Sequence, residues 1–244
     1  MIFNIDAKAL LPDCSEQIDA INLIYTQLSK LKNPVVTPYQ GQDKPVSPKV
    51  VWKFKIFGQC SIRRVIELCD IIQLSWHQNK PLGAFLAIRS VVENLAQTSH
   101  LTIGLKEALK NNDLSKVDEL IMKKMFGGRI DPSLPEAERI APQIRSLDKH
   151  FENRNDGKGP AFKDLYDLLC EMAHPNFMGM LGHYGKLNEE KRHFEFNDSH
   201  EKTKNNLGMI LTSLYPPLIT FYEITLELEI TVLELEKSYL GQEK

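Results

Sequence analysis

The sequence feature that most constrains the fold is a pair of long apolar patterns joined through a single proline. In residues 59–78, six apolar side chains recur at helical spacing and share one face: Ile62, Val65, Ile66, Cys69, Ile72 and Trp76. Pro81 suits the first turn of the next helix, because its missing N–H would have no helical partner there in any case. The second pattern covers 81–110, with a candidate break at Gly104. Two adjoining helices of this length indicate a helical bundle.

Helical spacing predicts five further helices, and prolines mark the segments between some of them. The expected helices are 15–32, 113–126, 137–151, 160–174 and 200–238. Residues 33–57 contain four prolines and read as an irregular crossing segment. Pro216 and Pro217 are expected to kink or divide the last helix. Short apolar segments at 180–184 and 192–196 flank a polar turn and predict a small β-hairpin.

These elements predict an all-α fold: an up-and-down bundle of about six to eight helices with a small β-hairpin insertion near 180–196. The chain has no internal repeat and no low-complexity tract, so we expect one domain over 1–244. Within it, residues 15–57 would supply the N-terminal helix and the crossing segment. Residues 59–238 would form the bundle.

Composition excludes several classes of protein. The 42% hydrophobic and 25% charged content is that of a globular chain, which argues against disorder. The net charge of −2 gives no general attraction to nucleic acid. The four cysteines form no Cys-x-x-Cys pair and indicate free thiols in a reducing compartment. The uncharged run 205–222 is interrupted by polar residues and by Pro216-Pro217. We therefore expect a soluble cytoplasmic protein with no signal peptide, no membrane span and no cofactor.

The strongest candidate site lies at the end of the predicted helix 160–174. Glu171 and His174 share one stripe of this helix with Asp167, and Tyr166 shares a second stripe with Cys170 that meets the first at His174. Pro175 ends the helix. Asn176 follows directly, so an acid, an imidazole, a phenol and an amide gather at one helix terminus. Two interpretations follow from the residues: a functional site centred on His174, or a structural cap in which Asn176 shapes the turn.

A second candidate group lies on the predicted helix 81–110. Arg89, Glu93, Gln97 and His100 fall on one face, opposite an apolar face. Charged residues within so apolar a helix are expected to be buried and paired. We therefore expect Arg89 and Glu93 to face the helix that carries His174.

Two weaker patterns involve other histidines. Arg145 and His150 are separated by four residues on the predicted helix 137–151, and an exposed helix end is the favoured interpretation of this pair. His174, His183 and His193 could converge with Glu171 on a metal if the hairpin folds back. Their spacing is not that of a known metal motif, so we expect no metal site. The chain also has no phosphate-binding glycine loop and no nucleophile elbow.

Three segments together resemble a group of bacterial all-helical proteins of unknown activity. They are Arg89-x-x-x-Glu93, the segment 144–149 (Ile-Arg-Ser-Leu-Asp-Lys), and Tyr-x-x-Leu-x-Glu-x-x-His-Pro-Asn-x-x-Gly over 166–179. These proteins are distantly similar to the HEPN superfamily (higher eukaryote and prokaryote nucleotide-binding), and the similarity covers roughly residues 60–185. In HEPN ribonucleases an arginine and a nearby histidine cleave RNA without metal, typically across a dimer interface. In this chain the only such pair is Arg145 and His150.

The resemblance and the polar residues lead to a functional expectation. We expect a HEPN-like homodimer that acts on RNA or a nucleotide, with His174 as general acid or base and Arg89 opposite a phosphate charge. Glu171 and Tyr166 would orient His174, and Glu93 would hold Arg89. Two alternatives remain open: an interaction protein whose acidic helix 219–238 is the partner surface, and a metal-dependent hydrolase built on the histidines.

Overall fold

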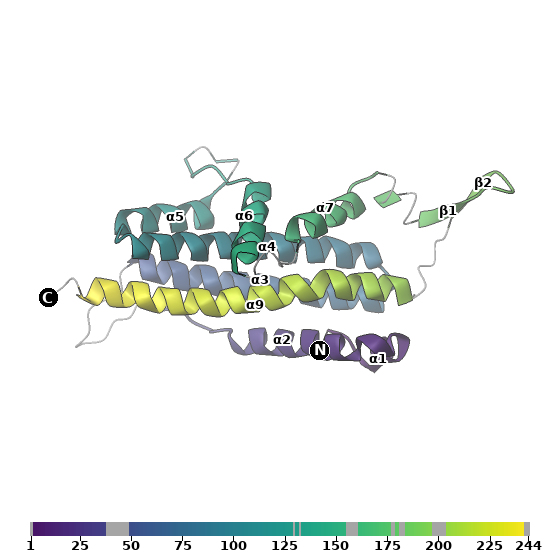
Figure 1. Ribbon diagram of the computed structural model, residues 1–244, viewed down its shortest axis with the longest axis horizontal. Helices are drawn as coiled ribbons and strands as arrows, with labels where there is room; N and C mark the ends of the chain where they lie inside the picture. Colours follow the sequence, from purple (N-terminus) through teal and green to yellow (C-terminus); the bar gives the residue numbers. More distant parts are fainter. Residues whose placement is uncertain are drawn as a thin grey trace.

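The computed structural model describes most of the chain as helix (Figure 1). The described residues are 2–37, 49–128, 130–131, 133–154, 161–176, 179–180, 184–196 and 204–241. The helices are α1 (Ile5–Leu10), α2 (Ser15–Lys30), α3 (Lys49–His77), α4 (Pro81–Lys110), α5 (Leu114–Phe126), α6 (Ile140–Arg154), α7 (Phe162–Ala173) and α9 (Lys204–Gly241), with a 3₁₀ turn at Pro12–Cys14. The strands β1 (Gly185–Asn188) and β2 (His193–Phe196) form an antiparallel hairpin. The expected all-α bundle with one small hairpin is confirmed.

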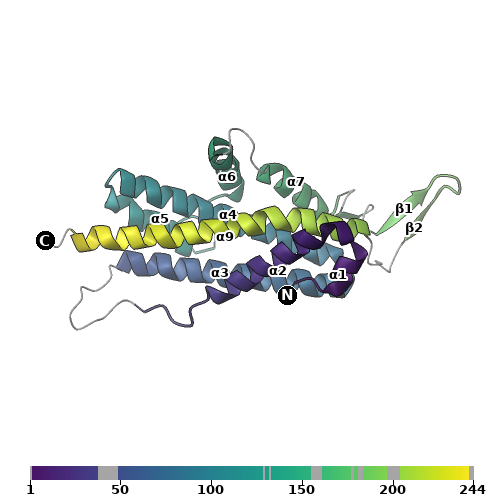
Figure 2. The same ribbon diagram turned by 60° about the horizontal axis from the view of Figure 1, so that its bottom comes forward.

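Helix α4 is the centre of the bundle. It packs against α3 and α9 on one side and against α5, α6 and α7 on the other. Helices α1 and α2 form a separate layer that packs on α9 and α3, below α9 in Figure 1 and in front of both helices in Figure 2. Followed by colour in Figure 1, α7 runs antiparallel to α4. Among the described helices, none has both the length and the apolar character that crossing a bilayer requires.

Helix α3 begins ten residues earlier than expected. The irregular segment was predicted to run to residue 57, but α3 starts at Lys49, directly after the last of the four prolines. The prediction was wrong because the first turns of α3 pack against distant residues. Phe54 and Phe57 are buried in a cluster with Leu101 and Leu105 of α4, and this tertiary contact stabilises the helix.

Helix α9 is a single helix with Pro216 and Pro217 inside it, so of the two expected effects, a kink or a division, the division does not occur. A proline inside a helix removes a backbone hydrogen bond and costs about 3 kcal/mol. Leu214 and Leu218, on either side of the prolines, are fully buried. Burying such side chains contributes about 1.5–3 kcal/mol each, and the two leucines together offset a large part of the cost of the two prolines. The candidate break at Gly104 is also absent, because α4 continues to Lys110.

The hairpin exists, but its first strand lies later than expected. The pairing register places Gly185 opposite Phe196 and Asn188 opposite His193, whereas the first strand was predicted at 180–184. The first part of the segment predicted to be the turn, residues 186–188, belongs to β1. Asn188 ends that strand, and its Oδ1 accepts the N–H of Lys191 at 3.1 Å, so an asparagine-led turn sets the register.

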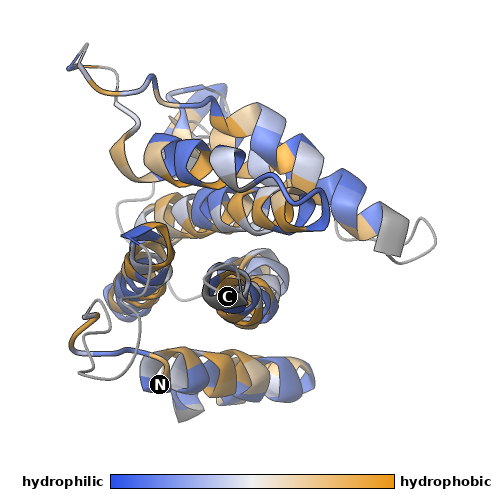
Figure 3. Ribbon diagram, turned by 90° about the vertical axis from the view of Figure 1, so that its left-hand side faces the viewer, coloured by the Kyte–Doolittle hydropathy of each residue, from blue (hydrophilic) through white to orange (hydrophobic). Residues whose placement is uncertain are grey.

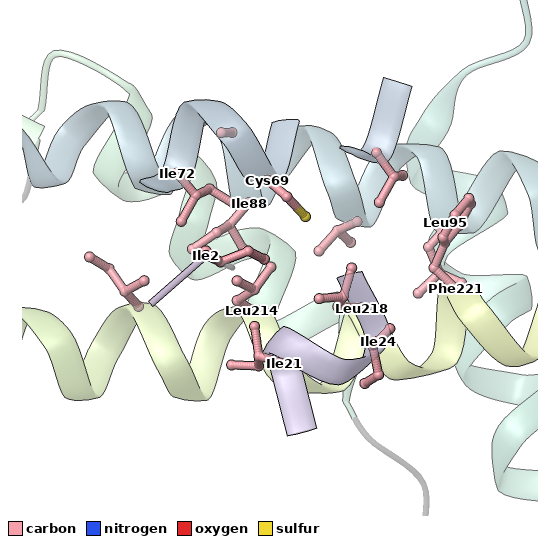
Figure 4. Packing of buried hydrophobic residues seen from close by; sticks show 14 of the residues in the cluster. Ile2, Ile21, Ile24, Cys69, Ile72, Ile88, Leu95, Leu214, Leu218 and Phe221 are labelled. Carbon is pink, nitrogen blue, oxygen red and sulfur yellow. The ribbon is translucent and has the colours of Figure 1, made fainter. Parts of the chain in front are cut away.

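The hydrophobic core consists of two clusters along the bundle. The larger cluster joins α2, α3, α4 and α9, and Figure 4 shows Ile21, Cys69, Ile88 and Leu218 meeting within it. The smaller cluster lies toward the other end of α3, α4 and α9. The end-on view in Figure 3 shows α9, near the label C, in the middle of the bundle with the other helices around it. Between the clusters, buried polar residues from three helices form a layer: Ser61, Asn94, Thr98 and Thr225.

Candidate functional site

Helix α7 brings Tyr166 against two charged residues of α4. The Tyr166 hydroxyl donates to Oε1 of Glu93 at 3.1 Å and accepts from Nη2 of Arg89 at 3.4 Å. The guanidinium carbon of Arg89 also lies 5.4 Å from the centre of the Tyr166 ring, within reach of a cation–π interaction. The expectation that Arg89 and Glu93 face this helix is confirmed. We call these three residues the Arg89 cluster.

Arg89 and Glu93 form an ion pair along α4. Nε of Arg89 lies 3.2 Å from Oε1 of Glu93, but Nε has no well-aligned hydrogen bond. The contact is therefore a charge interaction rather than a linear hydrogen bond. The side chains are 27% and 30% exposed, so solvent reaches the edge of the pair. This partial exposure limits the pair's contribution to stability to about 1 kcal/mol or less.

The cluster perturbs the titration of its members. Burial raises the pKa of Tyr166 to about 12, with Arg89 acting to lower it and Glu93 to raise it. Burial acts to lower the pKa of Arg89, but the Tyr166 hydroxyl, Cys170 and Glu93 together raise it. Tyr166 is thus a neutral hydrogen-bonding group at neutral pH, and Arg89 is a fixed positive charge.

His174 occupies the C-cap of α7, as the following proline predicted. Its backbone is extended, with φ −85° and ψ 151°, and its N–H donates to the Cys170 carbonyl at 3.0 Å. The His174 side chain is exposed. Along the axis of α7, His174 lies about 6 Å from Cys170 and about 12 Å from Tyr166. Within the described residues, no contact joins the His174 ring to Tyr166 or to Glu171.

Glu171 and Asn176 instead bond to each other. Nδ2 of Asn176 donates to Oε2 of Glu171, and Oδ1 of Asn176 accepts the N–H of Gly179 at 3.0 Å. Gly179 itself lies against the backbone, where a Cβ atom would overlap the His174 carbonyl oxygen. We call residues 171–176 together with Gly179 the His174 turn. Its polar side chains shape the backbone that presents His174.

Arg145 and His150 do not form a pair. Both lie on α6, where a separation of five residues turns the side chains about 140° apart. Arg145 is exposed, whereas the His150 ring packs edge-on against Phe151 at 5.5 Å. The structure thus places them on different sides of the helix.

A metal centre finds no support in the part of the chain that the structure describes. No three His, Cys, Asp or Glu side chains there are arranged to hold an ion. His193 bonds Glu195 on the hairpin at 3.1 Å, and His183 lies outside the described residues.

A polar cluster around the buried side chain of Lys124 joins α4, α5 and α6, and the sequence pattern had singled out only one of its members, His100. Oε2 of Glu138 accepts from Nζ of Lys124 and from Nε2 of Gln143 at 3.2 Å, and lies 3.9 Å from Nδ1 of His100. The Lys124 side chain is only 4% exposed. Burial lowers the pKa of Lys124 despite its acidic partner, and burial together with Lys124 lowers the pKa of His100. Because its charges are matched internally, we interpret this cluster as architectural.

Comparison of the chain with protein-family models, curated proteins and solved structures found no match.

Proposed function

We propose that the surface formed by α4 and α7 binds RNA or a nucleotide through a phosphate, and that His174 acts there as a general acid or base. The observation that carries this proposal is the Arg89 cluster. Glu93 and Tyr166 hold one side of the guanidinium, and Nη1 of Arg89 has no partner among the described residues. A guanidinium oriented in this way retains donors that match a phosphate.

The roles of the other residues follow from their contacts. Arg89 would bind the phosphate and stabilise charge that develops on it. Tyr166 and Glu93 are positioning residues, because they touch Arg89 and not His174. Glu171 and Asn176 position His174 through the backbone of the His174 turn. An exposed imidazole is free to exchange protons with a bound ligand.

Metal-free RNA cleavage needs two proton transfers. A base takes the proton of the 2′-hydroxyl as its oxygen attacks phosphorus, and an acid protonates the departing 5′-oxygen. One imidazole cannot do both in the same step, so the proposal includes a homodimer in which a second copy supplies another His174. The mass of the protein in solution, measured by light scattering, tests this part separately.

The test is cleavage of a mixed RNA pool by the purified protein in the presence of EDTA. A general acid or base contributes about 10²–10⁴-fold, so His174→Ala should reduce cleavage at least 100-fold. Because the ring is exposed and only the backbone of His174 is bonded, the melting temperature should not change. His150→Ala, on α6, is the matched control and should retain activity. Loss only in His150→Ala would move the site to α6.

The second candidate function is that of a non-enzymatic interaction protein. The mutual hydrogen bond of Glu171 and Asn176 favours it, because both side chains then serve the turn rather than a ligand. The acidic helix expected to provide the partner surface is part of α9, where Ile230 and Leu233 are 59% and 52% exposed. Absence of cleavage by every form of the protein, with unchanged melting temperatures, would favour this function over the first.

A further inference from the structure

A cavity of about 470 Å³ opens between α3, α4 and α9, on the side covered by the chain that follows α2. Its inner wall is the polar layer between the two core clusters, where Ser61, Thr98 and Thr225 stand in place of larger apolar residues. Gly58 of α3 adds to the space because it has no side chain. Small residues at one level of three neighbouring helices thus create the cavity. Its volume falls within the range of about 300–1,000 Å³ that is typical of small-molecule sites.

The walls of the cavity are largely apolar. Phe54, Ile62, Leu228 and Val232 line it from the two core clusters, and Val36 covers it from the segment after α2. Ligand sites of this kind bury an apolar body and use a few polar groups for orientation. The wall composition therefore predicts a ligand with a hydrocarbon or aromatic portion.

Two hydroxyl groups in the inner wall of the cavity can still accept a hydrogen bond. The hydroxyls of Thr98 and Thr225 donate to carbonyl oxygens of their own helices at 2.9 and 2.7 Å, so their oxygens retain acceptor capacity. The cation Lys55 is already bonded to both carboxylate oxygens of Glu236, at 3.2 and 3.0 Å. The Nε2 of Gln59 donates to the Leu31 carbonyl at 2.9 Å. A ligand with hydrogen-bond donors would complement the hydroxyl oxygens of Thr98 and Thr225.

One acidic side chain at the cavity has no counter-ion among the residues that the structure describes. Glu229 of α9 lines the rim, and it makes no ion pair or hydrogen bond within the described residues. Burial raises the pKa of Glu229, in keeping with its place among the apolar residues that line the cavity. Glu229 is nevertheless an exposed residue, so solvent would partly screen a cation bound to it.

We propose that this cavity binds a small molecule with an apolar body and an ammonium group, with the ammonium at Glu229 and the apolar part against Phe54 and Leu228. The ammonium supplies donors and positive charge to a site that has free acceptors and an unpaired carboxylate. The cavity shares no lining residue with the Arg89 cluster or the His174 turn. The proposal is therefore independent of the proposed action on RNA.

The experiment compares three probes of equal chain length by isothermal titration calorimetry: octylammonium, octanoate and octanol. We expect octylammonium to bind the wild-type protein with one site and more tightly than the other two. Glu229→Gln should weaken octylammonium about five-fold, which corresponds to about 1 kcal/mol at 1.4 kcal/mol per factor of ten. The same variant should leave the affinity for octanol unchanged.

Two further variants make the result specific. Glu223→Gln is the matched control, because Glu223 is an exposed acid on the same helix that does not line the cavity. It should not change the affinity for octylammonium. Thr225→Leu places a larger side chain in the cavity and should abolish binding of octylammonium and octanol alike. Equal binding of octanoate and octylammonium, equal effects of the two glutamate variants, or no binding by any probe would each overturn the proposal.

Discussion

Replacing Asp148 with alanine should destabilise α7, although Asp148 belongs to another helix, α6. Oδ1 of Asp148 accepts the N–H of Phe162 at 2.8 Å, and Oδ2 accepts that of Lys163 at 2.9 Å. The first N–H groups of a helix have no partner within it. The residue at the N-cap of α7 is Ala161, which has no side chain that could accept them. Asp148 of α6 therefore caps α7 from a distance.

The expected loss follows from these two hydrogen bonds. Replacing a capping side chain by alanine costs about 0.5–2 kcal/mol. Burial raises the pKa of Asp148, so desolvation of the carboxylate offsets part of the gain from its two donors. We therefore expect Asp148→Ala to lower the free energy of unfolding by about 1.5 kcal/mol. Asp148→Asn keeps an acceptor oxygen but loses the charge, and about half of that loss is expected.

The assay is urea unfolding combined with amide hydrogen exchange. Exchange at Phe162 and Lys163 should accelerate in Asp148→Ala more than exchange in α3 or α4. Asp164→Ala is the control, because Asp164 is an exposed acid in the same first turn whose side chain accepts no hydrogen bond from the described residues. Its loss should stay below about 0.5 kcal/mol. Equal losses in the two alanine variants, or unchanged exchange at Phe162 and Lys163, would refute the capping role.

Three other substitutions test separate parts of the fold. Gly58→Ala should raise the free energy of unfolding by about 0.5–1 kcal/mol in urea, because an interior glycine weakens α3 and a Cβ would meet only Leu228, at 3.8 Å. A decrease would show that the bundle does not accommodate the methyl group. Gly179→Ala should lower the melting temperature, since its Cβ would overlap the His174 carbonyl oxygen; an unchanged value would contradict the close approach. The pKa of His100 is lowered in the folded state, so the unfolded chain takes up this proton at a higher pH than the folded protein does. The free energy of unfolding therefore decreases as the pH falls below the ordinary pKa of 6.5. His100→Gln should remove that part of the slope in thermal melts between pH 7 and 5, and an unchanged slope would contradict the assignment.

Part of the candidate site could be predicted from the sequence. A charged pair within an apolar helix must be satisfied, and this requirement placed Arg89 and Glu93 against α7 correctly. Pro175 determined where α7 ends, because pre-proline residues avoid helical geometry. The partners of Glu171 and Asn176 could not be assigned in the same way. Both side chains could reach either His174 or each other, and only the three-dimensional path of the turn selected their mutual hydrogen bond.

The sequence by itself determined the helical class and several helix boundaries. The helix predicted at 81–110 is α4 (Pro81–Lys110), and the helix predicted at 15–32 is α2 (Ser15–Lys30). Apolar spacing and proline act over a few residues, so their effects can be read along the chain. The early start of α3 could not be read in this way, because it depends on Phe54 meeting Leu101.

Tertiary structure alone decided the features that need two or more helices. The capping of α7 by Asp148 joins residues that lie fourteen and fifteen positions apart. The cavity at Glu229 requires small residues of α3, α4 and α9 to stand at one level of the bundle. Nothing in the local spacing of Gly58, Thr98 or Thr225 shows that they meet. The relative shift of neighbouring helices sets that level, and it arises from the packing of their side chains.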